Sequence, residues 1–298
     1  MNHRTVVSKV PTMQQILRSL ALILVPATML CAAGEGRQEK TLDTTREPRI
    51  SLTNLKGVVL VRGWDKAQVH VVSTVASPRV EVDAECLPDT GPADKVHFTT
   101  HVLNPLGNGN DQVVDYTLDV PAGSSLEIRN PQGKIRVEGM QAEADIQSVG
   151  GDIVVADFSG HLSVRSVGGN IEVLRPSGHV EAYSITGNLH FVSPTTTKLR
   201  GSTTSGHILF EGDFMERGDY ILSAYSGDLD IICPPSASFE LNEKTVRGKV
   251  INSLPIKRRR ESASPMASSN SLLGTHNTGK ATLELTSFSG TIRIRPQM

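Results

Sequence analysis

The sequence predicts an all-β protein: a single-domain β-solenoid with two main strands in each coil of 18–21 residues, preceded by an irregular antiparallel β cap. Three observations predict this class. Apolar pairs recur every nine residues, a glycine precedes nearly every pair, and the chain holds 26 Gly and 16 Pro with only 4% aromatic residues. Such a composition favours short strands joined by tight turns over helices.

Residues 1–33 are predicted to be a signal peptide. Basic residues precede an apolar stretch from Leu20 to Leu30, and two alanines follow Cys31. The stretch is too short to span a bilayer, and a short buried helix is the alternative. A lipid anchor at Cys31 stays open beside simple cleavage, although the large residue before the cysteine disfavours lipidation. We therefore expect an exported protein of the periplasm, the outer membrane or the cell surface.

Residues 34–48 are polar and are predicted to be a linker, and residues 49–123 are predicted to be the N-terminal β cap. The cap holds candidate strands without a strict period, separated by turn signals. These strands are Val58–Val61, Val69–Val72, Val80–Val82, Val96–Thr100 and Val113–Leu118. We expect them to cover the first coil, because a bare solenoid end invites aggregation.

The solenoid is predicted over residues 124–298. Its strands are marked by apolar pairs at positions i and i+2 that start nine residues apart. The pairs are Ile135/Val137, Ala144/Ile146, Ile153/Val155, Leu162/Val164, Ile171/Val173, Val180/Ala182 and Leu189/Phe191. Residues i and i+2 of a strand share one face. No single strand can bury that face alone, whereas stacked coils can.

One class of glycine marks a corner of each coil, and these glycines are the structural site residues that the sequence predicts. They are Gly57, Gly133, Gly151, Gly169, Gly187, Gly206, Gly227, Gly248 and Gly290. From Gly133 the steps are 18, 18, 18, 19, 21, 21 and 42 residues, so the last step is either two coils or one coil with an insertion. Glycine suits a corner because it accepts positive φ without a Cβ clash.

The insertion alternative points to residues 255–280, which lack alternation and are rich in Ser, Asn and charge. We predict a disordered loop there. Its basic run, Lys257–Arg260, is compatible with a protease site or an anionic contact, but a solvated loop cluster is favoured.

Three segments resemble the bacterial putative-adhesin family, domains of unknown function that are also called toastrack domains. The segments are Asn54–Asp65, Val114–Gly123 and the serial coils typified by Ser148–Val155. The resemblance extends from Arg49 to the C-terminus, and the insertion departs from it. It implies a β-solenoid at the cell envelope that acts in surface contact, scaffolding or signal sensing. The family has no established reaction, so the resemblance implies none here.

Two columns of side chains are candidate metal sites, since residues one coil apart stack at about 4.8 Å. Asp152, Asn170 and Asn188 share one column. The aspartate of calcium-binding nonapeptides is not repeated, so a hydrogen-bonded ladder that caps the turns is favoured. His161 and His179 share another column without a third zinc ligand at matching spacing, which favours exposed turn histidines. We expect no metal and no cofactor.

Cysteines and catalytic residues give no further site. Cys86 and Cys233 are predicted to be separate buried thiols, with a disulfide left open. A hexapeptide acyltransferase helix would need apolar residues where Gln141 and Gln147 stand. The candidate outward residues form none of the paired acids that polysaccharide-cleaving enzymes use; they are Val154, Glu172, His190 and Asp230. We therefore expect no catalytic residue and no enzyme.

The function expected from these observations is that of an exported, non-catalytic envelope or cell-surface protein. It would bind surface glycans or envelope proteins through flat sheet faces, with membrane contact only through an anchor at Cys31. A formal net charge of −1 argues against a nucleic-acid partner. Two alternatives remain: an envelope-stress or signalling sensor partnered with a membrane protein, and a polysaccharide-acting β-helix enzyme.

Overall fold

A computed structural model describes residues 36–103, 112–258 and 271–297 of the 298-residue chain. The predicted signal peptide, with Cys31, lies outside the described residues. Within these ranges the elements are all strands, and no helix long and apolar enough to cross a membrane is present. The predicted all-β class is confirmed.

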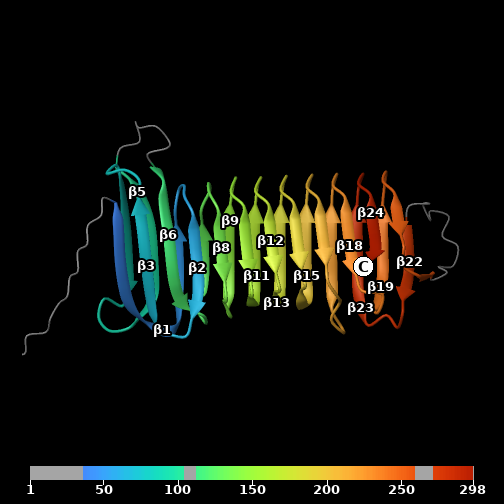
Figure 1. Ribbon diagram of the computed structural model, residues 1–298, viewed down its shortest axis with the longest axis horizontal. Helices are drawn as coiled ribbons and strands as arrows, with labels where there is room; N and C mark the ends of the chain where they lie inside the picture. The colour runs from blue at the N-terminus through green and yellow to red at the C-terminus, as the bar shows by residue number, and fades with distance from the viewer. Residues whose placement is uncertain (1–35, 104–111, 259–270, 298) are drawn as a thin grey trace, which may run out of the picture. The chain divides into compact units, whose positions relative to one another are not determined.

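Two ladders, sheet A and sheet B, form the fold, and strand β1 (Arg37–Thr53) contributes its first half to sheet A and its second half to sheet B (Figure 1). Beyond β1, the order across sheet A is β3 (Gln68–Val75), β6 (Val114–Pro121), β2 (Val59–Trp64), β8 (Ile135–Glu138), β10 (Ile153–Ala156), β12 (Ile171–Leu174), β14 (Leu189–Val192), β16 (Ile208–Glu211), β18 (Leu229–Cys233), β24 (Ile292–Pro296) and β20 (Val250–Asn252).

Sheet B holds the other strand of each coil. Its order is β4 (Val80–Leu87), β5 (Ala93–Val102), β1, β7 (Ser125–Arg129), β9 (Glu143–Ser148), β11 (Ser159–Ser166), β13 (Ser177–Ser184), β15 (Thr195–Thr203), β17 (Asp219–Ala224), β23 (Ala281–Ser287), β19 (Phe239–Thr245), β22 (Ser271–His276) and β21 (Lys257–Arg258).

The central coils confirm two strands per coil. The chain alternates between the sheets, and each strand runs parallel to the strand one coil later, so that Ile153 pairs with Ile171 and Leu162 with Val180. The side chains of the predicted apolar pairs point between the sheets and are 0–1% exposed. A dry core therefore runs along the stack and holds the two sheets together.

The coils at both ends do not stack in sequence order. The coil β1–β2 lies between β5–β6 and β7–β8, and the coil β23–β24 lies between β17–β18 and β19–β20. In Figure 1 the red strand β24 lies beside β18, whereas β22, which precedes β24 in the chain, lies further toward the end of the stack. The 42-residue step from Gly248 to Gly290 arises because the chain first forms the outer coil β19–β20. It then turns back, and the next coil, β23–β24, fits between β17–β18 and β19–β20.

The predicted linker at residues 34–48 is wrong from Arg37 onward. β1 begins there and pairs antiparallel with β3 over Arg37–Asp43. This half of β1 is an edge of sheet A, and nearly all of its side chains are exposed. The segment reads as polar because an exposed edge strand needs no apolar alternation.

The predicted disordered loop at residues 255–280 is wrong for the parts that the structure describes. β21 and β22 pair with each other, and β22 runs antiparallel to β19. Leu272 and His276 of β22 are buried. Residues 259–270, which include the end of the basic run, lie outside the described residues.

The cap prediction is confirmed in its strands. All five candidate segments fall on β2 to β6, and β4–β5 and β3–β6 are antiparallel pairs. Cys86 on β4 and Cys233 on β18 are both free thiols. Burial raises the pKa of Cys233 to about 12, which keeps this thiol protonated and unreactive.

Candidate functional site

The corner glycines line one edge of the stack, where the chain passes from sheet B to sheet A; we call this the glycine edge. In spatial order they are Gly57, Gly133, Gly151, Gly169, Gly187, Gly206, Gly227, Gly290 and Gly248. A Cβ atom on any of them would lie 1.6–2.0 Å from a backbone carbonyl oxygen of the neighbouring coil. This contact demands glycine along the whole column. Positive φ, the reason predicted from the sequence, holds at Gly57 and Gly133 and is wrong for the other seven glycines.

A ladder of side-chain acceptors follows the glycines, as the sequence predicts. The Asp152 carboxylate accepts the N–H of Asn170 at 3.0 Å, Asn170 Oδ1 accepts the N–H of Asn188 at 3.1 Å, and Asn188 Oδ1 accepts the N–H of His207 at 2.8 Å. The predicted turn-capping ladder is confirmed. In the part of the chain that the structure describes, no group of three or more His, Cys, Asp or Glu side chains is placed to hold a metal ion.

A second ladder was missed from the sequence. At six of the nine corners a hydroxyl three residues before the glycine accepts its N–H: for example, Ser166 Oγ bonds Gly169 at 2.9 Å and Ser184 Oγ bonds Gly187 at 2.8 Å. The spacing of a hydroxyl residue and a glycine at i and i+3 was the available signal. These bonds engage the N–H groups of the corner glycines within the protein, so few of these backbone donors are left for a ligand.

The outward surface of sheet B, which we call face B, is a broad polar surface of the central coils. It consists of three rows of side chains that run across the strands from β1 to β19. The rows are Arg49, Ser125, Glu143, His161, His179, Lys198, Asp219, Thr282 and Glu240; Ser51, Glu127, Asp145, Ser163, Glu181, Arg200, Ile221, Glu284 and Asn242; and Thr53, Arg129, Gln147, Arg165, Tyr183, Ser202, Ser223, Thr286 and Lys244.

The predicted histidine column lies in the first row. His161 and His179 stand on β11 and β13, with ring centroids 4.6 Å apart, so their placement in turns is wrong. His179 Nε2 lies 3.1 Å from the Glu181 carboxylate. Burial, and then the neighbouring Lys198 and His161, lower the pKa of His179. Its neutral ring can both donate and accept a hydrogen bond at neutral pH.

Short ion pairs cross face B. Arg129 lies 2.7 Å from Glu127, and Arg165 lies 2.9 Å from Asp145. These pairs are substantially exposed, and exposed pairs typically contribute less than about 1 kcal/mol. Their charged groups can therefore exchange partners at little cost when a polar ligand arrives.

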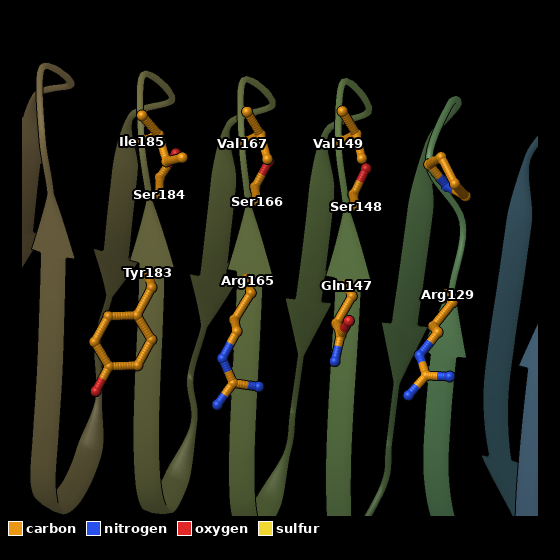
Figure 2. Close-up of a pocket in the computed structure, with 11 residues that line it drawn as sticks. Arg129, Gln147, Ser148, Val149, Arg165, Ser166, Val167, Tyr183, Ser184 and Ile185 are labelled. Carbon is orange, nitrogen blue, oxygen red and sulfur yellow. The ribbon is translucent and has the colours of Figure 1, made fainter.

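An open groove of about 480 Å³ follows the junction between face B and the glycine edge (Figure 2). Arg129, Gln147, Arg165 and Tyr183 form its polar side. Its other side is apolar, with Val149, Val167 and Ile185 stacked in a line above the serines of the second ladder. The groove combines hydrogen-bonding groups with an apolar wall.

The predicted outward residues of sheet A fall in one row, where His190 contacts two acids. Its ring nitrogens lie 3.7 Å from Glu172 and 3.4 Å from Glu211. Asp230 pairs with His207 at 3.2 Å, and Val154 lies further along the row. The acids pair with histidines and not with one another.

Comparison with known proteins finds similar folds only among solved structures. No family model matches the sequence, and no curated protein matches it. A putative adhesin from Bacteroides fragilis shares 10% identity at a TM-score of 0.45, and one from Parabacteroides merdae shares 7% at 0.41. A putative lipid binding protein from Parabacteroides distasonis shares 10% at 0.36. Each similarity covers 88% of this chain and 98% of the other.

Identities of 10% or less with TM-scores below 0.5 transfer no function to this chain.

Proposed function

We propose that the protein is an exported, non-catalytic, adhesin-like protein of the cell envelope that binds a surface glycan across face B. One observation carries this proposal: of the 27 outward positions in the three rows, only Ile221 lacks a hydrogen-bonding side chain. A flat surface of mixed donors and acceptors suits a ligand that presents hydroxyl groups along its length.

The geometry of the rows supports an extended ligand. Equivalent side chains recur at the strand spacing of about 4.8 Å, so one chain-like ligand can contact many coils in the same way. Each contact replaces a water or a weak surface pair and contributes little alone. Many such contacts in register give useful affinity through multivalency.

The test is retention of the full chain on purified insoluble bacterial cell-wall polysaccharide. We expect the triple variant Gln147→Ala, Arg165→Ala and Tyr183→Ala to bind at least about tenfold more weakly, because each lost hydrogen bond contributes roughly 1 kcal/mol. The matched control replaces three outward residues of sheet A, Arg136→Ala, Glu172→Ala and His190→Ala, and should be retained like the unmodified chain.

Equal retention of the two triple variants would contradict the assignment to face B. A chain that ignores the polysaccharide but captures one envelope protein through the same residues would replace the glycan with a protein partner.

A further inference from the structure

A line of exposed apolar side chains runs along the glycine edge, two residues before each corner glycine; we call it the apolar ridge. In spatial order its positions are Leu55, Pro131, Val149, Val167, Ile185, Thr204, Tyr225, Phe288 and Val246. Val149 is 52% exposed, Ile185 is 50% exposed and Tyr225 is 58% exposed. Figure 2 shows three of these side chains stacked above the polar side of the groove. Six of the nine ridge positions hold exposed apolar side chains, while Pro131 and Phe288 are half-buried and Thr204 is polar. Apolar exposure repeated at one position of the coil requires an explanation beyond folding.

The backbone beneath the ridge is already bonded from coil to coil. Gly168 N–H donates to Val149 O at 2.8 Å, and Thr186 N–H donates to Val167 O at 2.9 Å. The ridge therefore lacks the row of free backbone groups that an added peptide strand would need. Whatever covers the ridge contacts side chains.

The residues next to the ridge differ in charge between its middle and its ends. The corner tips of its middle coils are uncharged: Gly150, Gly168, Thr186, Ser205 and Ser226. Exposed basic residues stand near its two ends, Lys134 at one and Arg247 with Lys249 at the other. Such an order suits an apolar layer with a negatively charged surface above it.

The acids beside the ridge have other partners. Asp152 accepts the Asn170 N–H, and Asp228 accepts the Thr291 N–H at 2.7 Å and pairs with Arg293 at 3.0 Å. At the opposite edge of the stack exposed carboxylates are paired with basic residues, Glu216 with Lys280 and Asp157 with Arg175. Along the ridge Lys134, Arg247 and Lys249 outnumber the two acids Asp152 and Asp228, so an anionic surface is attracted to the glycine edge.

We propose that the apolar ridge docks on an anionic lipid surface and holds the stack by its glycine edge. Val, Ile, Tyr and Phe side chains enter the boundary between headgroups and acyl chains, while Lys134, Arg247 and Lys249 contact the lipid phosphates. The ridge is only one side chain wide. Stable protein interfaces bury broad patches of roughly 800 Å² per partner, so a line of single side chains suits a lipid surface better than a protein partner. This docking uses the glycine edge and not the three rows of face B, so it goes beyond the proposed glycan binding.

The test places a tryptophan on the ridge and another off it in the full chain. Ile185→Trp replaces a ridge residue, and Ile251→Trp replaces an equally exposed residue on β20 of sheet A, 47% exposed against 50%. With phosphatidylglycerol vesicles that carry brominated acyl chains, we expect about twofold quenching at position 185 and none at 251. The apolar stretch Leu20–Leu30 and Trp64 are common to both variants, so the difference reports on the ridge.

A second pair of variants measures the affinity. Val149→Ser, Val167→Ser and Ile185→Ser together should weaken vesicle binding roughly tenfold, and neutral phosphatidylcholine vesicles should bind the unmodified chain weakly. The control removes three exposed apolar residues elsewhere, Leu87→Ser, Met215→Ser and Ile251→Ser.

Equal quenching at both positions, or equal loss in both triple variants, overturns the proposal. So does a concentration-dependent blue shift at position 185 without vesicles, which would show that a second copy covers the ridge. Retention on wall polysaccharide should be unchanged in the variant Leu55→Ser with Val246→Ser, two exposed ridge residues outside the groove, so the two proposals fail independently.

Discussion

Replacing Glu243 with leucine is expected to stabilise the protein strongly above pH 8. Glu243 points into the core from β19 and is 0% exposed, and neither carboxylate oxygen has a hydrogen-bond partner among the described residues. Its neighbours in register are Leu285 on β23 and Leu272 on β22. Leu285 occupies the equivalent inward position one coil away, so a leucine at position 243 would match its apolar surroundings.

The pH dependence has a defined sign. Burial raises the pKa of Glu243 from 4.5 to about 8. Between these values the folded chain keeps a proton that the unfolded chain has lost, so stability falls as the pH rises and levels off above the folded pKa. A separation of this size corresponds to about 5 kcal/mol at most.

Urea denaturation at pH 5 and pH 8.5 measures this effect. The unmodified chain should lose several kcal/mol between the two conditions, and Glu243→Leu should lose much less. The control Glu240→Leu changes an exposed carboxylate on the same strand and should keep the dependence of the unmodified chain. Parallel stability curves for Glu243→Leu and the unmodified chain would show that the carboxyl is not buried as described.

Substituting alanine for Gly169 is expected to damage the central coils severely. Its Cβ would lie 1.9 Å from the carbonyl oxygen of Gly151, so two coils must separate. We expect a loss of more than about 3 kcal/mol in unfolding free energy, in the range of severe core substitutions.

The adjacent glycine provides a matched control. A Cβ at Gly168 meets nothing closer than 3.6 Å, and this glycine does not have left-handed φ. Gly168→Ala should therefore be neutral or stabilise by up to about 1 kcal/mol, because alanine restricts the unfolded chain. Thermal unfolding of the two variants decides the point. Similar melting temperatures would mean that the close approach of the coils is not what requires glycine.

The coils were predictable because their inward pairs and corner glycines repeat at nearly constant spacing. Ile153 and Ile171 occupy equivalent positions, and nothing interrupts the register between them. The order of the end coils was not predictable. β19 and β23 present similar apolar alternation to the core, and spacing along the chain cannot say which of them neighbours β17.

Glu243 and β1 show two further limits of pattern analysis. A charged residue in a strand is normally predicted to point outward. Only the alternation of buried and exposed residues along β19 places Glu243 on the inward side. The first half of β1 reads as a linker because its side chains are exposed on an edge.

The candidate surfaces were only partly visible in the sequence. Val149, Val167 and Ile185 precede corner glycines at a constant distance, but their exposure follows from the way the corners project. Face B needs the strand register, since its rows combine residues that are 18 or more positions apart.

Hydroxyl-radical footprinting with soluble fragments of cell-wall polysaccharide tests glycan binding on face B most directly. Tyr183 lies on face B, and Tyr225, 58% exposed, lies on the apolar ridge, so one experiment reports on both surfaces. We predict that saturating glycan slows the oxidation of Tyr183 severalfold and leaves Tyr225 unchanged. Protection of Tyr225 alone, or of neither tyrosine while the glycan is bound, would contradict binding on face B.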